Sequence, residues 1–295
     1  SHIMTMTTNL IATLLKQNGK SLYTYPGGTI APIFHECKAV GVALICTKNE
    51  QGAGYMALAD AVVSGTPSFV AVTSGPGATN LVTCIADAFY DSIPLIAFTG
   101  QIGTKDLSRP EALRQRGFQE VPIVDMVRKI TKAAMQPRTP QELADALVQA
   151  VNLAQEGRPG PVLIDLPMDM QMSPLPDGLL ETMMEKLAVP SPGPTTAPIA
   201  PEVIGEIRNT LAIASRPVIL AGGGAIDAHE QLRNFARRHG IPVLTSMRGL
   251  GAFPSNDPLF AGWVGHTGLP WANWALSQAD WVLVLGSRLD VRQTG

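Results

Sequence analysis

Short apolar runs separated by longer amphipathic stretches repeat along the first 167 residues of the chain. Four such runs predict buried strands, at residues 21–25, 42–46, 69–73 and 93–100. The stretches between them have helical periodicity, and small residues are concentrated in 51–64. Two more strands are predicted at 130–135 and 161–166, on either side of a helix over 139–156. Strands that alternate with helices in this way indicate an α/β fold with a parallel sheet.

Two stretches interrupt this alternation. The polar, arginine-rich stretch 101–119 is predicted to be a surface loop near the strand ends, and the proline-rich stretch 168–200 is predicted to be a linker, because proline lacks an N–H donor and fixes φ. A second β-α alternation follows, with about three strands, at 217–220, 241–244 and 281–285. We therefore predict two doubly wound domains, residues 5–167 and 201–295, joined by the linker 168–200. The second is expected to be incomplete, since such domains usually have about five or six strands.

Composition and charge narrow the function classes. A formal net charge of −2, with only 16% charged residues, offers no basic face to nucleic acid or to an anionic membrane. No apolar run approaches the length of a membrane span, and no secretory leader pattern is visible; residues 1–4 resemble the remnant of an expression tag. The three cysteines lack CxxC spacing, which favours a reducing compartment over disulfides or a zinc site. We expect a cytoplasmic enzyme with no metal-ligating residues in this sequence.

Glu50 is the main candidate for chemistry. It follows an apolar strand, stands at the first turn of a predicted helix, and could be preceded by an Asn49 cap. A carboxylate there can also do no more than complement the helix dipole. The glycine-rich turns at 26–28 and 74–77 end strands of the same predicted sheet, whose carboxyl edge is where such folds bind ligands. They match neither GxGxxG nor GxxxxGK[ST], so by mechanism alone they could be simple tight turns.

Several ordered motifs together resemble one enzyme family. These motifs are Tyr25-Pro26-Gly27-Gly28, Asn49-Glu50-Gln51-Gly52-Ala53, Thr73-Ser74-Gly75-Pro76-Gly77-Ala78-Thr79-Asn80, Asp91-Ser92-Ile93-Pro94 with Thr99-Gly100-Gln101, and Phe118-Gln119-Glu120-Val121. They look like the pyrimidine-binding domain of thiamine-diphosphate enzymes of the acetolactate synthase group. The resemblance runs from about Leu10 to the end of the chain, with residues 249–254 continuing it into a Rossmann-like central domain.

The resemblance implies roles for individual residues. Glu50 would hydrogen-bond N1′ of the aminopyrimidine of thiamine diphosphate, in a site whose cofactor is bound mainly by a partner subunit. Gly28 and Gln119 match family positions that line the reacting centre. The remaining cofactor-binding positions implied in this domain are Pro26, Gly27, Ser74, Gly75, Pro76, Gly77 and Asn80.

The central domain raises the question of FAD. Positions that contact FAD in the family correspond here to Gly222, Gly223, Gly224, Arg288, Asp290 and Arg292. However, residues 265–268 read GHTG where the family has Gly-Met-His-Gly, and 289–291 read LDV where it has Phe-Asp-Asp. FAD is therefore left open as a second cofactor.

The implied activity is decarboxylation of a 2-oxo acid such as pyruvate, followed by carboligation to a second 2-oxo acid. In the family, Mg²⁺ is held with the diphosphate by a Gly-Asp-Gly motif on a third domain, and this sequence contains no such motif, so the 295 residues alone are expected to be inactive. The expected partners are the small-molecule substrate, further copies of the chain as a dimer or tetramer, and a regulatory subunit. Two alternatives remain: a sister carboligase or decarboxylase with another acceptor, and a non-catalytic nucleotide-binding module.

Overall fold

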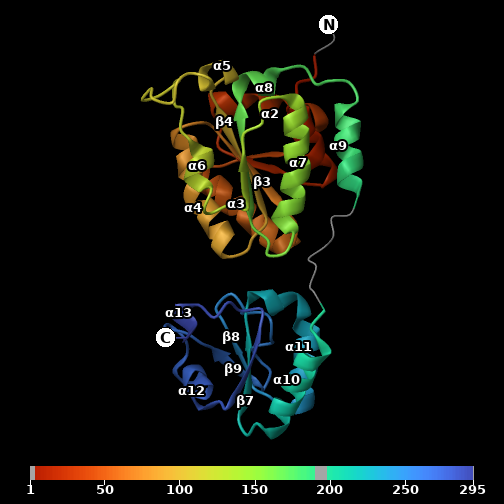
Figure 1. Cartoon of the computed structure of the whole chain (residues 1–295), viewed down its shortest axis with the longest axis vertical. Helices are drawn as coiled ribbons and strands as arrows, with labels where there is room; N and C mark the ends of the chain where they lie inside the picture. Colours follow the sequence, from red (N-terminus) through yellow and green to blue (C-terminus); the bar gives the residue numbers. More distant parts are fainter. Residues whose placement is uncertain (1–3, 190–197, 295) are drawn as a thin grey trace. The chain divides into compact units, whose positions relative to one another are not determined.

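The computed structural model describes residues 4–189 and 198–294, and the chain divides into two compact units, residues 1–196 and 197–295 (Figure 1). Each unit has its own sheet and its own buried core. The predicted class, two α/β units with parallel sheets, is confirmed.

The first unit is built on a six-stranded sheet whose neighbouring strands are all parallel, in the order β2-β1-β3-β4-β6-β5. The strands are β1 (Leu22–Thr24), β2 (Leu44–Cys46), β3 (Ser68–Val72), β4 (Leu95–Gln101), β5 (Ala133–Met135) and β6 (Pro161–Pro167). The chain places β2 on one side of β1 and β3 on the other, so the direction of strand addition reverses between β1 and β3. Such a switch point is where parallel sheets open a crevice at their carboxyl edge.

Helices cover both faces of this sheet. One core cluster contains residues of α1 (Asn9–Gln17), α2 (Ala31–Val40), α7 (Pro140–Gln155) and α9 (Leu179–Ala188), and the other contains residues of α3 (Glu50–Ser64), α4 (Pro76–Tyr90) and α6 (Ile123–Val127). Along β3, Phe69 and Ala71 belong to the first cluster, whereas Val70 and Val72 belong to the second. Strands covered on both faces are apolar at most positions, which is why their runs were visible in the sequence.

Three short elements complete the first unit: η1 (Gly28–Ile30), α5 (Thr104–Leu107) and α8 (Met168–Met172). The expectation of an unpacked linker from residue 168 differs from the structure. Here α8 and α9 form helices, and Met170, Leu179 and Met183 are buried in the first cluster. Residues 190–197 of the expected linker lie outside the described part. Likewise α5 forms within the expected surface loop 101–119, although most of residues 108–119 are exposed.

The second unit has a four-stranded parallel sheet in the order β10-β7-β8-β9. Its strands are β7 (Pro217–Ala221), β8 (Val243–Thr245), β9 (Phe260–Trp263) and β10 (Trp281–Leu285), and its helical elements are α10 (Pro201–Ile213), η2 (Gly223–Ala228), α11 (His229–His239), α12 (Pro270–Gln278) and α13 (Val291–Thr294). Ile219 and Val243 pack on the side of α11, and Leu220 and Leu244 on the side of α12. The prediction of about three strands missed β9.

Candidate functional site

The two glycine-rich turns of the first unit lie side by side, because β1 and β3 are neighbours in the sheet. Gly27 and Gly77 both approach Thr73, the residue that follows β3. A Cβ on Gly77 would lie 2.6 Å from Thr73 Cγ2, and one on Gly27 would lie 2.7 Å from the same atom. Any side chain at either position would force the turns apart, so both glycines are required for this close approach.

Glu50 is the first residue of α3, and its residue exposure is only 8%. The predicted cap is present, since Asn49 Oδ1 accepts a hydrogen bond from Gly52 N at 2.7 Å. From the neighbouring helix α4, Asn80 Nδ2 donates to Glu50 Oε2 at 3.0 Å. Glu50 Oε1 receives no hydrogen bond from the described residues and lies 3.5 Å from the point where a Cβ on Gly77 would sit. The carboxylate therefore has one oxygen held by Asn80 and one oxygen available to a ligand. A carboxylate that only complements a helix dipole requires neither a fixed orientation nor a free oxygen.

Gly75 and Gln119 meet at the edge of the same turn. Both have φ of +59°, and a Cβ on Gly75 would lie 2.8 Å from Gln119 Cβ. A left-handed conformation is unfavourable for a residue with a side chain, so Gln119 is held there by its surroundings. This contact places Gln119 beside the turn at 74–77, although 44 residues separate it from Gly75 in the sequence.

Three other predicted residues lie on the same two turns. Pro26 and Gly28 are exposed, and a Cβ on Gly28 would meet no atom within 4 Å. Ser74 is 1% exposed, and its hydroxyl has no hydrogen-bond partner within residues 4–189 or 198–294. A buried hydroxyl without a partner is costly, and it marks a position where a ligand could supply one.

Sequence reasoning missed a buried polar cluster beneath this edge. Asp165, in the middle of β6, is fully buried and accepts hydrogen bonds from Thr99 Oγ1 at 2.7 Å, Gln101 Nε2 at 3.0 Å and Gln136 Nε2 at 2.8 Å. Burial raises the pKa of Asp165 to about 6, against the lowering effect of the three donors. A single acid inside the apolar run of residues 162–166 was the available signal.

In the second unit the three predicted glycines lie against other segments of the same unit. A Cβ on Gly222 would lie 2.6 Å from Ser287 Cα, and one on Gly224 would lie 3.0 Å from Gly286 Cα. Glycine is required at 222 and 224 because the segment that follows β7 passes directly against the segment that follows β10, which leaves no room for a side chain. A Cβ on Gly223 would be in ordinary contact with Arg248.

The predicted charged residues of this unit follow β10. Arg288 Nε lies 3.6 Å from Asp290 Oδ2, and Asp290 Oδ1 accepts from Arg292 N at 2.9 Å. The carbonyl of Arg292 accepts from His266 N at 2.6 Å, which joins this segment to the loop at 265–268. The three charged residues therefore lie together beside that loop, and their described contacts are with one another and with the backbone.

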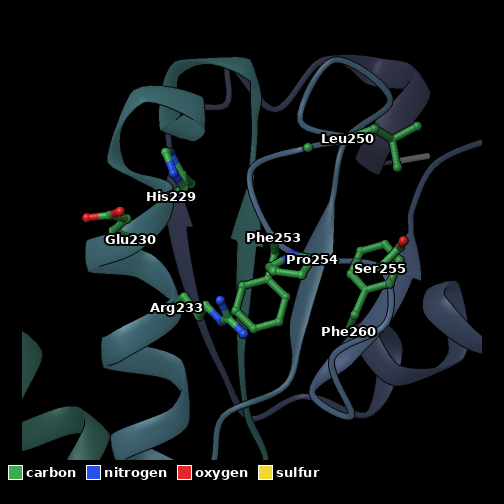
Figure 2. Close-up of a pocket in the computed structure, with 9 residues that line it drawn as sticks. His229, Glu230, Arg233, Leu250, Phe253, Pro254, Ser255 and Phe260 are labelled. Atoms are coloured by element: carbon green, nitrogen blue, oxygen red, sulfur yellow. The ribbon is translucent and has the colours of Figure 1, made fainter.

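A separate pocket of about 420 Å³ lies in the second unit between α11 and residues 250–260 (Figure 2). Arg233 reaches toward Phe253 across it, whereas Glu230 points away. Among its lining residues none belongs to the predicted site.

No three His, Cys, Asp or Glu side chains of the described chain are grouped so as to hold a metal ion. None of the described helices is both long enough and apolar enough to span a membrane.

Comparison with known proteins places both units. The model of the thiamine pyrophosphate enzyme N-terminal TPP binding domain matches residues 4–126, and that of the thiamine pyrophosphate enzyme central domain matches residues 204–295. The acetolactate synthase large subunit of Corynebacterium glutamicum is 37% identical over 99% of this chain and 45% of its own length. The acetolactate synthase isozyme 1 large subunit of Escherichia coli is 37% identical over 97% of this chain and 49% of its own length.

A third relative, the probable acetolactate synthase large subunit of Methanocaldococcus jannaschii, is 38% identical over 97% of this chain and 47% of its own length. The chain thus spans a little under half the length of these relatives. The Glu50 carboxylate and both glycine turns fall within the matched N-terminal domain. The chain belongs to the thiamine pyrophosphate enzyme family, of which it contains the N-terminal domain and residues of the central domain.

Proposed function

We propose that the protein carries out thiamine-diphosphate-dependent decarboxylation of a 2-oxo acid such as pyruvate, with carboligation to a second 2-oxo acid. The observation that carries this proposal is the Glu50 carboxylate, buried beside two glycine turns with Oε2 fixed by Asn80 and Oε1 unpaired among the described residues. Relatives named acetolactate synthase support the same reaction class.

The residues present fit an aminopyrimidine ring. Glu50 Oε1 can share a proton with a ring nitrogen, and Gly77, which has no side chain, lies beside that oxygen. The buried, unpartnered Ser74 hydroxyl supplies another polar group on the same turn. Thiamine diphosphate, when bound, supplies a thiazolium carbon that becomes a nucleophile once it loses its proton.

The part of Glu50 in this chemistry is to hold a proton at N1′ of the pyrimidine. Asn80 fixes the orientation of the carboxylate by occupying Oε2, so that Oε1 is presented in one direction. Low exposure keeps water from competing for that hydrogen bond, which makes the proton transfer directional. Gly28 and Gln119 are proposed to border the space for the reacting carbon, with Pro26, Gly27, Gly75 and Pro76 shaping its walls.

We further propose that a second copy of the chain completes the site. The helix that carries Glu50 also exposes apolar side chains, including Tyr55, Met56, Val62 and Val63, the last of them 89% exposed. A surface of this kind on a helix is typical of a protein interface. In this proposal Glu50 serves cofactor bound mainly by the partner subunit, and the assembly is a dimer or tetramer.

The identities of further components stay predictions. Mg²⁺ would accompany the diphosphate. FAD would bind the second unit, where Arg288 and Arg292 could contact its pyrophosphate. A flavin absorbance spectrum of the purified full-length protein tests FAD. A regulatory subunit and a cytoplasmic location are likewise predictions.

The decisive experiment replaces Glu50 by glutamine in the full-length protein and follows exchange of the C2 proton of bound thiamine diphosphate by NMR. Glu50→Gln should slow this exchange about 100-fold or more, because the amide cannot exchange a proton with N1′ in the same way. The matched control is Glu36→Gln, a buried glutamate of the same unit that bonds Met6 N and Asn9 instead. Exchange that is as fast in Glu50→Gln as in Glu36→Gln would refute the proposed role.

A sister carboligase with another acceptor is distinguished by product analysis. The full-length protein is incubated with pyruvate alone and with an added aldehyde. Acetolactate from pyruvate alone supports the first proposal, whereas an aldehyde adduct without acetolactate supports the sister enzyme. Binding of an adenine nucleotide without any binding of thiamine diphosphate would instead indicate a nucleotide-binding module.

A further inference from the structure

Thr29 lies at the junction of the two glycine turns. It belongs to η1, directly after Gly28, and is half-buried. Its Oγ1 accepts a hydrogen bond from Ser74 N at 2.9 Å and lies 2.8 Å from Thr73 Oγ1, with which it shares a second hydrogen bond. One hydroxyl therefore connects the turn after β1 to the turn after β3.

The backbone of Thr29 is anchored from the opposite direction. Gln171 Nε2, on α8, donates to the carbonyl of Thr29 at 2.7 Å and to the carbonyl of Leu166 at 2.8 Å. The Cα of Gly100, on β4, also lies against Thr29, since a Cβ there would come within 2.6 Å of the Thr29 carbonyl carbon. Thr29 is thus enclosed by segments that follow or belong to β3, β4 and β6, which limits its freedom to move.

The turn that Thr29 holds is the start of α4. Ser74 immediately precedes Gly75, the N-cap residue of α4, and Asn80 lies in the second turn of that helix. Asn80 in turn fixes Oε2 of Glu50. A shift of the Ser74 backbone would therefore move the amide that orients the carboxylate.

We propose that Thr29 is a positioning residue, whose hydroxyl fixes the two glycine turns against each other and thereby sets the geometry of Asn80 against Glu50. The use of that geometry in thiamine diphosphate binding rests on the proposed function above. The geometry itself does not, because every contact in it lies within this chain.

The hydroxyl and the methyl group of Thr29 can be separated by substitution. Thr29→Val keeps the shape and removes the acceptor of the Ser74 N–H, which is buried and then has no partner. Thr29→Ser keeps the hydroxyl and removes the methyl group. If Thr29 acts only by packing, Thr29→Ser should perturb the turns because it removes the methyl group. If the hydroxyl positions the turns, Thr29→Val should perturb them instead.

Thr24→Val is the matched control. Thr24 is fully buried in β1, five residues before Thr29, and its hydroxyl donates to the carbonyl of Ala71 at 2.7 Å. The substitution Thr24→Val removes a buried threonine hydroxyl from β1, the strand that leads into the turn, and leaves the contacts of Ser74 unchanged. General destabilisation of the unit should therefore be similar in the two valine variants.

The test is amide hydrogen exchange and NMR of the full-length protein and of its three variants. We expect exchange of the Ser74 amide to accelerate about tenfold or more in Thr29→Val, and to stay within about twofold of the parent in Thr29→Ser and Thr24→Val. The side-chain amide signals of Asn80 should shift in Thr29→Val alone. Unchanged Ser74 exchange, or an unchanged Asn80 signal, in Thr29→Val overturns the proposal, as does equal behaviour of the serine and valine variants.

A parallel titration with thiamine diphosphate and Mg²⁺ separates this inference from the proposed function. If the parent binds and Thr29→Val binds at least about tenfold more weakly, the geometry is used for the cofactor. Equal affinity of parent and Thr29→Val overturns that use. A parent that does not bind at all counts against the proposed function, while the Ser74 and Asn80 signals still decide the role of Thr29.

Discussion

Replacing Asp165 by asparagine should change how the stability of the first unit depends on pH. The carboxyl group is buried between Thr99, Gln101 and Gln136, and burial raises its pKa from 3.8 to about 6. The folded state therefore holds the proton more tightly than the unfolded state. The stability contributed by this proton is complete below the unfolded pKa of 3.8 and is lost as the pH rises through about 6.

The magnitude follows from the size of the shift. About two pKa units correspond to roughly 3 kcal/mol of free energy of unfolding between low and neutral pH. Asparagine imitates the protonated acid, because its oxygen can accept from both glutamine amides while its NH₂ donates to the Thr99 hydroxyl. Asp165→Asn should therefore gain roughly 2 kcal/mol relative to the parent as the pH rises from about 4 to about 7, and the rest of the difference appears only below pH 4.

The assay must report on the first unit alone. All four tryptophans lie between residues 263 and 281, so their fluorescence follows the second unit. Denaturant-dependent hydrogen exchange of peptides from β4 and β6 follows the first, and each pH is compared between parent and variant so that other titrating groups cancel. A difference in stability that stays constant within about 0.5 kcal/mol from pH 4.5 to 7.5 would refute the reasoning.

Three further predictions concern packing, capping and thiol exposure. Gly54→Ala should destabilise the first unit by about 1–3 kcal/mol in urea unfolding, because the new Cβ would lie 2.7 Å from Cys84 Sγ at the contact between α3 and α4. Asn49→Ala should lower stability by about 1 kcal/mol in the same assay, since it removes the cap of α3. In the native protein at mildly alkaline pH a disulfide reagent should label exposed Cys46 first, because burial raises the pKa of Cys37 to about 12 and that of Cys84 to about 11.

The packing and thiol predictions have controls. Gly205→Ala, on α10, meets no atom within 4 Å and should be neutral or slightly stabilising in its own unit. If Gly54→Ala is equally harmless, α3 and α4 do not pack as described. Equal rates of labelling at all three thiols would contradict the burial of Cys37 and Cys84, and Cys46→Ser should remove the fast phase of labelling.

The strands of the first sheet could be predicted because they are covered on both faces, so that an apolar run such as 69–72 contains no polar interruption. The cap by Asn49 could be predicted from residue type and position. The contacts of the site could not, because the amide of Asn80 reaches Glu50 across 30 residues and Thr29 reaches Thr73 across 44. Those pairs depend on which strands are neighbours, and strand order is not written in local periodicity.

Two sequence predictions that differ from the structure, the linker from residue 168 and the number of strands in the second unit, have local physical causes. Prolines in residues 167–176 favoured a linker, yet Pro167 is the N-cap of α8. Leu179 and Met183, four residues apart, form a buried stripe that compositional reasoning over the whole stretch obscured. Strand β9 was missed because it has only four residues and includes Gly262, and glycine is uncommon inside strands; its φ here is +104°.

The pairing of β4 with β6 also sets the order in which the first unit can be completed during synthesis. Thr99 faces Asp165 in register, and the two are 66 residues apart in the chain. A ribosome delivers β1 to β4, together with Glu50 and Asn80, well before β6 is made. The hydrogen bond from Gln101 to Asp165 must wait for β6, whereas its hydrogen bond to the carbonyl of Val121 joins two segments made earlier. The polar cluster around Asp165 is therefore completed only when β6 arrives, after the residues that carry Glu50 and Asn80 have been made.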